Sequence, residues 1–438
     1  MLSYLGLLAG AALIVEAVRH KVNVGIAAAL AGIIVVVTSG GGLGVLLTSV
    51  RETIIESAGF TLLLSIAFIT MIGNIMRVSG ALGHLTRGIG RVIRDARVVA
   101  FVLPSLVGLL SVPGSSVFSA PLVDSVGRSL GMTKEQRVIT NVMFRHGWYY
   151  IYPIYAPLLL VQQISGVSYG AFILPGSIAA FLVFALTARM VFRTGPRPSP
   201  DDGSGESCSC SHECDIGACN DAASVKTPAH PALSILVAAS PILVVLLFGV
   251  GTSINFSIAT ALGALTALLA APSDGPYPQE VARRFREGAI RGIDWQVVGT
   301  VTGTVFFGRT IVNSQVLSSI AIGTGSSASA LSLFVFGFAL PFLAAFIIGS
   351  HLPAVGIAGP LLVPLLSGLP RPAGLVVALY MAAASGYLLS PAHVCFISTV
   401  QYLKADVRSS WRMLWGPGGA GLMLGLLLWV VQAAVNLV

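Results

Sequence analysis

Charged residues are scarce in this chain. They make up only 10% of its 438 residues, whereas hydrophobic residues make up 55%. A soluble domain carries about 25% charged residues, and the mean hydropathy here is +0.88. This shortage of charge excludes an ordinary soluble protein and predicts an all-α polytopic protein of the cell membrane, surrounded by lipid bilayer.

Lysine is nearly absent. The 25 basic residues include only four lysines, and most of the arginines are grouped in short loops between apolar segments. The positive-inside rule produces this distribution in membrane proteins. The net charge of +8 therefore does not indicate a nucleic-acid partner.

Carboxylates are rare in the apolar segments. Six of the 17 acidic residues lie in one polar loop between positions 201 and 221, and Asp124 alone lies inside a predicted membrane hairpin. A cation site made of several intramembrane carboxylates is therefore poorly supplied. The chain also lacks a phosphate-binding loop, a nucleotide fingerprint and a His-Glu-x-x-His motif, which disfavours a pump, a metalloprotease or another enzyme.

Ten apolar windows of about 20 residues predict transmembrane helices. No cleavable signal peptide is evident, so the first window is expected to be a retained span. The windows are Leu2–Val18, Val22–Thr38, Phe60–Val78, Gln136–Val161, Tyr169–Phe192, Pro231–Val250, Ile254–Ala271, Trp295–Val312, Gly374–Tyr402 and Met413–Val435.

Two longer apolar segments, 98–130 and 331–366, are interrupted near their centres and predict re-entrant hairpins. Their sequences match: Leu103-Pro104 and Ala120-Pro121 in the first have counterparts in Leu340-Pro341 and Gly359-Pro360 in the second. An amphipathic stretch, Val45–Ser57 or Glu280–Ile293, precedes the third span of each half and predicts a helix along the membrane surface. The chain thus divides into repeat 1 (1–193), a linker (194–230) and repeat 2 (231–438).

The arginine clusters predict the orientation of the two repeats. If both hairpins are non-crossing, every basic cluster falls on one face, which places the linker in the cytoplasm and both termini outside. Each half then has five crossings. Because five is odd, the halves are expected to be inverted repeats, with the hairpin tips meeting near the middle of the membrane.

Paired helix breaks are typical of a transporter's binding site, because non-helical backbone is tolerated in a membrane only where protein encloses it around a cavity. Unpaired N–H groups at such breaks favour anions, and Ser115, Ser116, Ser350 and His351 lie at the hairpin tips. The alternative is that these are kinks in packed helices. The predicted breaks lie at Pro113, Gly114, Pro153, Gly349, Pro353 and Pro391.

Polar residues beside the broken spans extend the predicted substrate site. They are Asn141, Arg145 and His146 in the first half and Ser390 and His393 in the second. An arginine inside a membrane usually has a functional partner, and we expect Arg145 to compensate the charge of an anionic substrate. It could instead form a structural ion pair with Asp124 or extend to the membrane surface. The histidines could carry protons or remain neutral and buried.

The linker is rich in cysteine. Soft ligands at this density could hold zinc, copper or an iron–sulfur cluster, although the spacing matches no standard zinc pattern. The alternative is a tolerated insertion in a flexible loop. The candidate ligands are Cys208, Cys210, His212, Cys214 and Cys219; Cys395, isolated in the membrane part, is interpreted as a small hydrophobic residue.

Several motifs resemble the domain of unknown function 401 (DUF401) family of prokaryotic membrane proteins. They are Leu103-Pro104-Ser105-Leu106, Phe144-Arg145-His146, Tyr152-Pro153-Ile154-Tyr155 and Ser390-Pro391-Ala392-His393-Val394-Cys395. The resemblance covers nearly all of the membrane part but not the linker. The family is similar to the ion transporter superfamily, which implies inverted repeats, opposed hairpins, a homodimer and elevator-type movement.

These features together predict a secondary transporter of a small anion, a carboxylate in particular, coupled to H⁺ or Na⁺ and needing no other cofactor. One alternative is a cation/proton antiporter, which Na⁺-dependent pH changes without an organic substrate would favour. Another is a membrane metal sensor or redox protein that uses the linker cysteines, which loss of activity on deleting the linker would favour.

Overall fold

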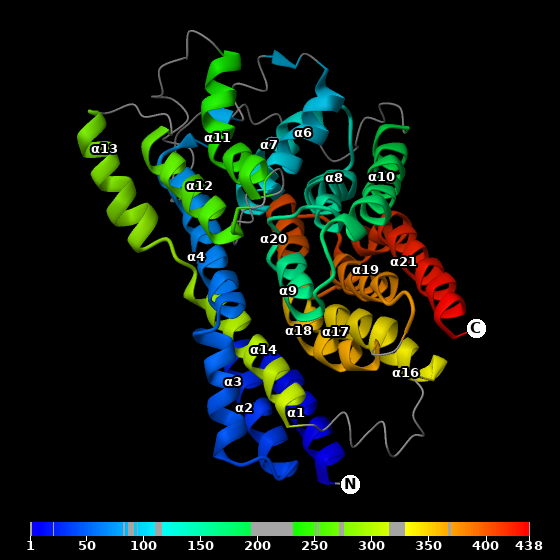
Figure 1. The fold of residues 1–438 in the computed structure, drawn as a ribbon. Coiled ribbons are helices and arrows are strands. Elements are labelled where there is room, and N and C mark those ends of the chain that lie inside the picture. Colours follow the sequence, from blue (N-terminus) through cyan, green and yellow to red (C-terminus); the bar gives the residue numbers. More distant parts are fainter. Residues whose placement is uncertain are drawn as a thin grey trace.

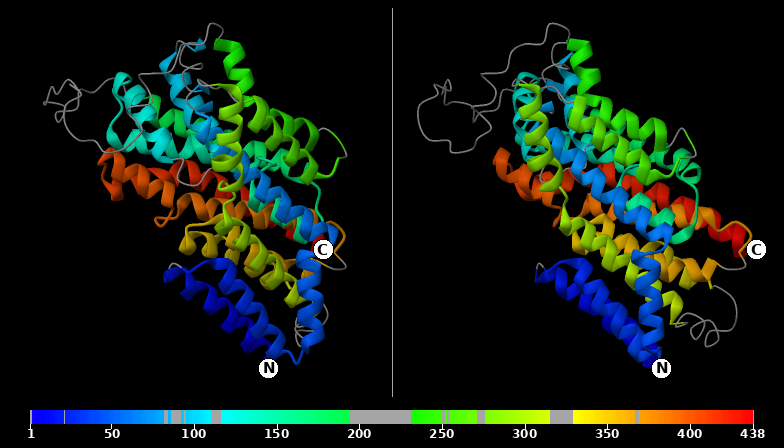
Figure 2. Two further views of the ribbon diagram at one scale, coloured as in Figure 1. Left: turned by 90° about the vertical axis from the view of Figure 1, so that its left-hand side faces the viewer. Right: turned by 60° about the vertical axis from the view of Figure 1, so that its left-hand side comes forward.

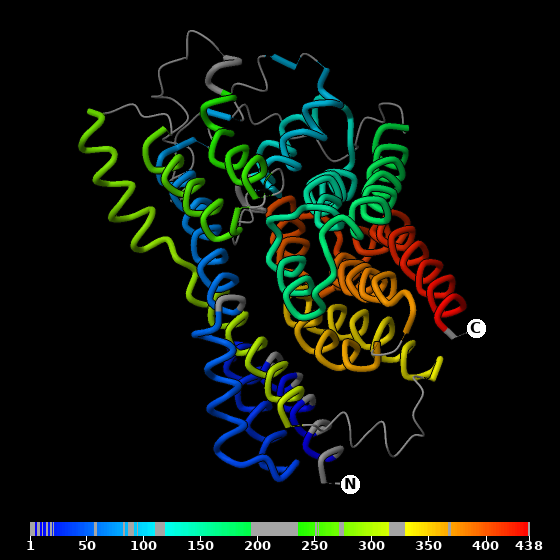
Figure 3. The backbone as a smooth tube through the Cα atoms, viewed as in Figure 1, coloured from blue at the N-terminus to red at the C-terminus, as the bar shows by residue number. Residues whose placement is uncertain are grey.

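A computed structural model describes residues 2–20, 22–81, 84–85, 92–93, 95–109, 116–193, 231–249, 252, 254–270, 276–314, 329–366 and 369–437. Figure 3 traces the backbone. The described residues form helices and no strand, which confirms the all-α prediction. The linker 194–230 lies outside the described residues.

The first half contains helices at each predicted position. They are α1 (Leu2–Arg19), α2 (Val24–Thr38), α3 (Leu43–Ile54), α4 (Ser57–Val78), α6 (Ala96–Leu109), α7 (Ser116–Ser129), α8 (Lys134–His146), η1 (Gly147–Tyr150), α9 (Ala156–Ser165) and α10 (Gly170–Phe192).

The second half repeats this order of elements. It comprises α11 (Pro231–Gly249), α12 (Phe256–Ala270), α13 (Tyr277–Arg283), η2 (Arg284–Ile290), α14 (Trp295–Asn313), α16 (Ala330–Phe334), η3 (Val335–Ala339), α17 (Leu340–Ile348), α18 (His351–Leu362), η4 (Val363–Leu366), α19 (Ala373–Leu389), α20 (Val394–Leu403) and α21 (Val407–Leu437).

Five helical stretches among the described residues are long and apolar enough to cross a bilayer. They are Gly59–Val78, Gly170–Phe192, Ala330–Ile348, Ala373–Leu403 and Val407–Asn436. Several other apolar helices, including α2 and α12, have only 10–17 residues. The helices fit a membrane protein, while the count of ten spans remains a prediction.

Helices from opposite halves pack against each other in pairs. Helix α2 lies along α14, and α4 lies along α12. Each of these two pairs, at the left of Figure 1, contains one helix from each half. Figure 2 shows α1 and α2 at the edge of the molecule. The α2–α14 contact is unusually close: a Cβ atom on Gly303 would lie 1.8 Å from the Gly25 carbonyl oxygen, so only glycine allows this approach.

The centre of the molecule is made by α8, α18 and α19. Nearly every residue of α19 is buried, and so is α8 from Gln136 onward. Helix α19 is apolar on all its faces, as expected for a helix enclosed by others. Helix α8 is more polar and begins with a capping box between Thr133 and Gln136, which satisfies N–H groups at its start. It therefore carries polar side chains into the core.

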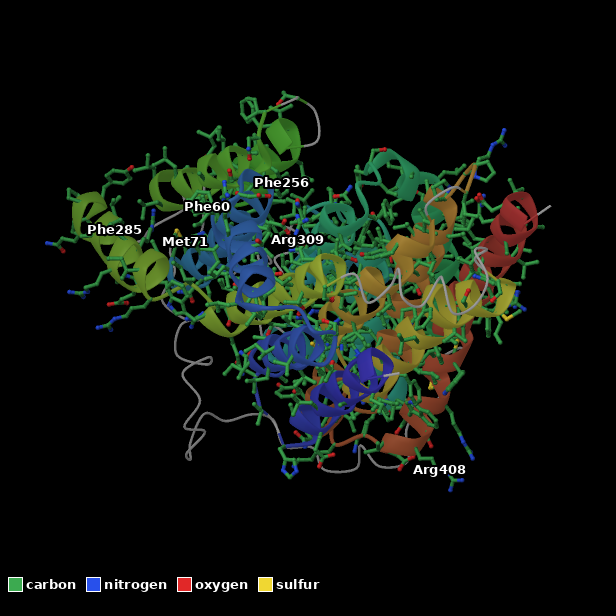
Figure 4. All side chains as sticks on the ribbon, turned by 60° about the horizontal axis from the view of Figure 1, so that its bottom comes forward. Phe60, Met71, Phe256, Phe285, Arg309 and Arg408 are labelled. Atoms are coloured by element: carbon green, nitrogen blue, oxygen red, sulfur yellow. The ribbon has the colours of Figure 1, made fainter. Side chains whose placement is uncertain are left out.

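The structure forms helices in both predicted amphipathic stretches, α3 in the first half and α13 with η2 in the second. Helix α3 packs on α14, whereas η2 packs on α4. Arg283 pairs with Glu280 at 2.7 Å, and Phe285 is exposed at the edge of the molecule in Figure 4. Arg309 of α14 lies 3.7 Å from Glu52 of α3, so an ion pair joins these two helices.

Candidate functional site

Helix α8 stops abruptly inside the molecule. It ends at His146, a short 3-10 turn follows at 147–150, and α9 begins only at Ala156. The segment between them contains Pro153, which has no N–H to continue a helix. Tyr149 and Tyr155 from this segment stack with their ring centroids 3.9 Å apart. Because the helix is interrupted here, the Tyr149 and Tyr155 rings occupy space that the backbone of a continuous helix would fill.

The segment between α17 and α18 forms a tight turn. Gly349 ends α17 with φ of 68°, a left-handed conformation that favours glycine. A Cβ atom there would also lie 2.7 Å from the Ala392 carbonyl oxygen. Ser350 then leads directly into α18, whose first residue, His351, is buried. The turn thus delivers the N-terminus of a 12-residue helix to the centre of the protein.

The break between α19 and α20 lies against that turn. Helix α19 ends at Leu389, Pro391 follows, and α20 begins at Val394. The Ser390 hydroxyl donates to the Phe346 carbonyl at 2.6 Å, so it ties the break to the end of α17. Trp411 donates its indole N–H to the Leu389 carbonyl at 2.9 Å, which satisfies an acceptor at the end of α19.

A buried polar cluster connects α8 with α20. The Asn141 amide donates to the Thr399 hydroxyl at 2.9 Å. The His146 and His393 rings meet edge to face with centroids 4.6 Å apart, and neither side chain is exposed. Arg145 is 2% exposed and lies within hydrogen-bonding reach of the Tyr149 hydroxyl. Histidines and an arginine from separate chain segments therefore share one enclosed region.

A cavity of about 660 Å³ opens beside this cluster, between the two halves. The first turns of five helices line it: α2 at Val24, α9 at Ala156, α14 at Gln296, α18 at His351 and α20 at Val394. Among the described residues that line it, Asp294 is the one carboxylate. Its side chain accepts from the amides of Gln296 and Val297 at 3.0 and 3.1 Å, so α14 already uses that charge.

The structure brings some of the predicted site residues to this cavity. Gly349, Ser350, His351 and Pro353 line it directly. His146 and His393 lie in the polar cluster, and Pro153 lines a separate cavity of about 370 Å³.

Other predicted residues are not placed. Pro113, Gly114, Ser115 and the linker ligands Cys208, Cys210, His212, Cys214 and Cys219 lie outside the described residues. Ser116 begins α7, and its side chain lies outside the description as well.

The suggested ion pair between Arg145 and Asp124 is replaced by others. Asp124 on α7 pairs closely with Arg137, and it pairs with Arg128 at 3.0 Å. Arg137 lies near the N-terminus of α8, about two helical turns before Arg145. The carboxylate is therefore used at the start of α8, and Arg145 belongs to the region around Tyr149.

Sequence reasoning missed several residues of the site. Cys395 was interpreted as a small hydrophobic residue, yet its sulfur lies near the His146 and His393 rings. Tyr155 and Tyr387 line the cavity, and the Tyr380 ring lies 4.7 Å from that of His351. The Ser-Pro-x-His-x-Cys motif was a usable signal for Cys395, because it places the thiol two residues after a buried histidine.

A scan against protein families matches residues 1–199 and 230–432 to the model described as Protein of unknown function (DUF401). The match covers both halves and omits most of the linker, as the resemblance in sequence suggested. A search of curated proteins finds no match. The chain belongs to the DUF401 family.

Proposed function

We propose that this member of the DUF401 family is a secondary active transporter of a small anion, with a carboxylate as the favoured class. One observation carries the proposal: five helices begin at the walls of one cavity between the two halves. The anion binds in this cavity, and H⁺ or Na⁺ supplies the driving force.

Helix N-termini are the appropriate binding groups for an anion. The first N–H groups of a helix have no partner within the helix, and the helix dipole places about half a positive charge there. Each such end stabilises a nearby negative charge by about 0.3–1 kcal/mol, and by more when water is excluded. Several helix N-termini directed at one cavity favour the binding of an anion there, even though no arginine is among the described residues that line the cavity.

The packing of helices supports an inverted repeat. If each element is exchanged for its counterpart in the other half, α2 on α14 becomes α12 on α4, and both contacts are present. The same exchange relates α3 on α14 to η2 on α4, and α9 on α18 to α20 on α7. Contacts that map onto each other in this way are expected of two halves related by a two-fold axis.

The repeat leads to a mechanism of alternating access. The pairs α6–α7 and α17–α18 act as opposed re-entrant hairpins, the linker is cytoplasmic, and both termini are outside. The halves move relative to each other around the cavity in an elevator-type motion, as the ion transporter superfamily resemblance implies, within a homodimer.

Ser350→Asp is expected to abolish anion binding while preserving the fold. Aspartate is as good as serine in the position before a helix, so α18 should still form. Its carboxylate would occupy the place of the ligand charge and repel an incoming anion. The measurement is thermal unfolding of the purified protein with carboxylates, sugar acids and inorganic oxyanions, because a ligand of the folded state raises the midpoint.

Ser350→Asn is the matched control for this change. Asparagine has the same shape and also caps helices, but it carries no charge, so the anion response should persist. If Ser350→Asp still responds to the same anions, the proposed cavity is not the binding site. A response to Na⁺ or pH alone in the unmodified protein would favour the antiporter instead.

Arg145→Ala is expected to weaken anion binding because it removes the buried positive charge behind Tyr149. Two unit charges about 8 Å apart interact by about 2 kcal/mol at an effective dielectric constant of about 20, or about 30-fold in affinity. Isothermal titration with the anion found in the screen measures the loss.

Two further variants separate charge from folding in this test. Arg145→Lys keeps the charge and should retain most of the affinity, whereas Arg408→Ala removes an exposed arginine at the start of α21, seen at the edge of Figure 4, and should change nothing. Unaltered affinity in folded Arg145→Ala protein would remove Arg145 from the site.

A further inference from the structure

Three potential metal ligands from opposite halves of the chain converge beside the cavity. His146 ends α8, while His393 and Cys395 lie at the start of α20. One ligand atom of each lies within 4.8 Å of the others. Both histidines are fully buried, and Cys395 lines the cavity wall. The cluster is therefore enclosed on one side and reachable from the cavity on the other.

The hydrogen bond of His146 fixes which of its ring nitrogens is available to a metal ion. Its Nδ1 lies 2.7 Å from the Val142 carbonyl oxygen. Because a carbonyl only accepts, Nδ1 carries the proton and Nε2 is left with a free lone pair. Metal-binding histidines are usually held in this way, with the second ring nitrogen donating to a carbonyl or carboxylate.

The remaining ring nitrogens lack a protein partner. Within the described part of the chain, His146 Nε2 and both ring nitrogens of His393 have no hydrogen-bond partner. Most buried polar atoms in proteins are hydrogen-bonded, so unsatisfied ones need an explanation. Unsatisfied nitrogens on two histidines that lie close to a thiol are explained if all three groups bind one ion.

We propose that His146, His393 and Cys395 form a three-coordinate site for a soft monovalent metal ion, Cu(I). Thiolate and imidazole are both copper ligands, and a soft thiolate suits Cu(I) as well as zinc. The site goes beyond the anion proposal and does not rest on it, because it uses these three side chains and not the helix ends.

Charge decides between Cu(I) and a divalent ion. The Cys395 thiolate and Cu(I) together are neutral, whereas zinc would leave a net positive charge beside the buried Arg145. A buried, uncompensated charge is costly, so the neutral complex is favoured. As the sulfur–copper bond forms, the thiol proton leaves through the cavity, and the oxidation state of the metal does not change.

The observed spacing is compatible with coordination after a small movement. Metal–nitrogen bonds of about 2.0–2.1 Å and a metal–sulfur bond of about 2.3 Å place trigonal ligands about 3.7 Å apart. The three atoms lie within 4.8 Å, so contraction by about 1 Å suffices. Rotation of the Cys395 side chain on the cavity side supplies part of that movement.

The test uses the full chain with Cys208, Cys210, Cys214 and Cys219 all changed to serine, so that Cys395 is the only remaining cysteine. The purified protein is titrated with Cu(I) under anaerobic, reducing conditions against a coloured Cu(I) chelator. We expect one equivalent to bind, with an X-ray absorption spectrum of two nitrogen ligands and one sulfur ligand.

Variants in the same background assign the ligands. Cys395→Ser and His393→Gln should each lower Cu(I) affinity at least 100-fold, and His84→Gln, at a buried histidine outside the cavity lining, should leave it unchanged. Unfolding midpoints of all three confirm that each protein is folded. Because either ligand variant tests the site, poor folding of one leaves the other decisive.

Three results would overturn the assignment: no Cu(I) bound in the parent, affinity retained in a folded ligand variant, or zinc bound as tightly as Cu(I). Anion stabilisation is measured on the same preparations. A protein that responds to anions but binds no copper refutes the metal site alone, and the reverse result refutes the anion proposal alone.

Discussion

Gly303→Ala is expected to destabilise the protein by about 3 kcal/mol or more, whereas Gly299→Ala on the same helix should be neutral or stabilising. A Cβ atom on Gly303 would lie 1.8 Å from the Gly25 carbonyl oxygen of α2. Neither backbone can yield without separating the two helices, and overpacking of this kind typically costs 1–3 kcal/mol or more. The contact joins the two halves, so the whole α2–α14 pair is affected.

Gly299 provides the control because it lies one turn earlier on α14. A Cβ atom there would meet only the Asn23 amide nitrogen at 3.9 Å, an ordinary contact. Both substitutions gain about 0.8–1 kcal/mol of helix propensity, so the difference between them isolates the close approach. Thermal unfolding of both variants in the same detergent measures it, and equal midpoints would mean that the helices do not touch in this way.

Asp124→Ala is expected to cost about 3–5 kcal/mol, because it leaves the Arg137 guanidinium buried without its carboxylate. The Arg137 side chain is 5% exposed, and its Nε donates to the Thr133 carbonyl at 3.3 Å. Asp124 also joins α7 to α8 at the start of the broken span. Equilibrium or kinetic unfolding in detergent reports the change.

Two further variants distinguish the buried ion pair from a general effect of removing charge. Arg128→Ala removes the exposed partner of the same carboxylate, whose side chain is 61% exposed, and should cost less than about 1 kcal/mol. Adding Arg137→Met to Asp124→Ala should recover most of the lost stability, because a buried pair can be replaced by apolar residues. An Asp124→Ala protein as stable as Arg128→Ala would contradict the buried pair.

The helix breaks were the most predictable feature of the fold because their chemistry is local. Proline lacks an N–H and glycine adopts left-handed conformations, so sequence alone indicated interruptions near Pro153, Gly349 and Pro391. The structure ends helices at His146, Ile348 and Leu389. Composition likewise predicted an all-helical chain, since a bilayer permits few other structures.

The contents of the site were harder to predict because they depend on which helix faces meet. Cys395 follows His393 by only two residues, but His146 is far along the chain from both, and nothing local to the pair indicates that third ligand. The five helix starts around one cavity belong to segments spread over both halves, so their convergence is a property of packing. Asp124 was matched to Arg145 and not to Arg137 for the same reason: the two arginines share α8, and only the register against α7 separates them.

The turn at Gly349 has a consequence for how the two proposed ligands affect each other. A Cβ atom on Gly349 would lie 2.7 Å from the Ala392 carbonyl oxygen, and the Ser390 hydroxyl donates to the Phe346 carbonyl at the end of α17. The turn before α18 and the segment before α20 are therefore packed directly against each other. An anion at the start of α18 and a metal ion at the start of α20 would therefore both act on this contact. Thermodynamic linkage requires that, if copper changes the affinity for the anion, the anion changes the affinity for copper by the same factor.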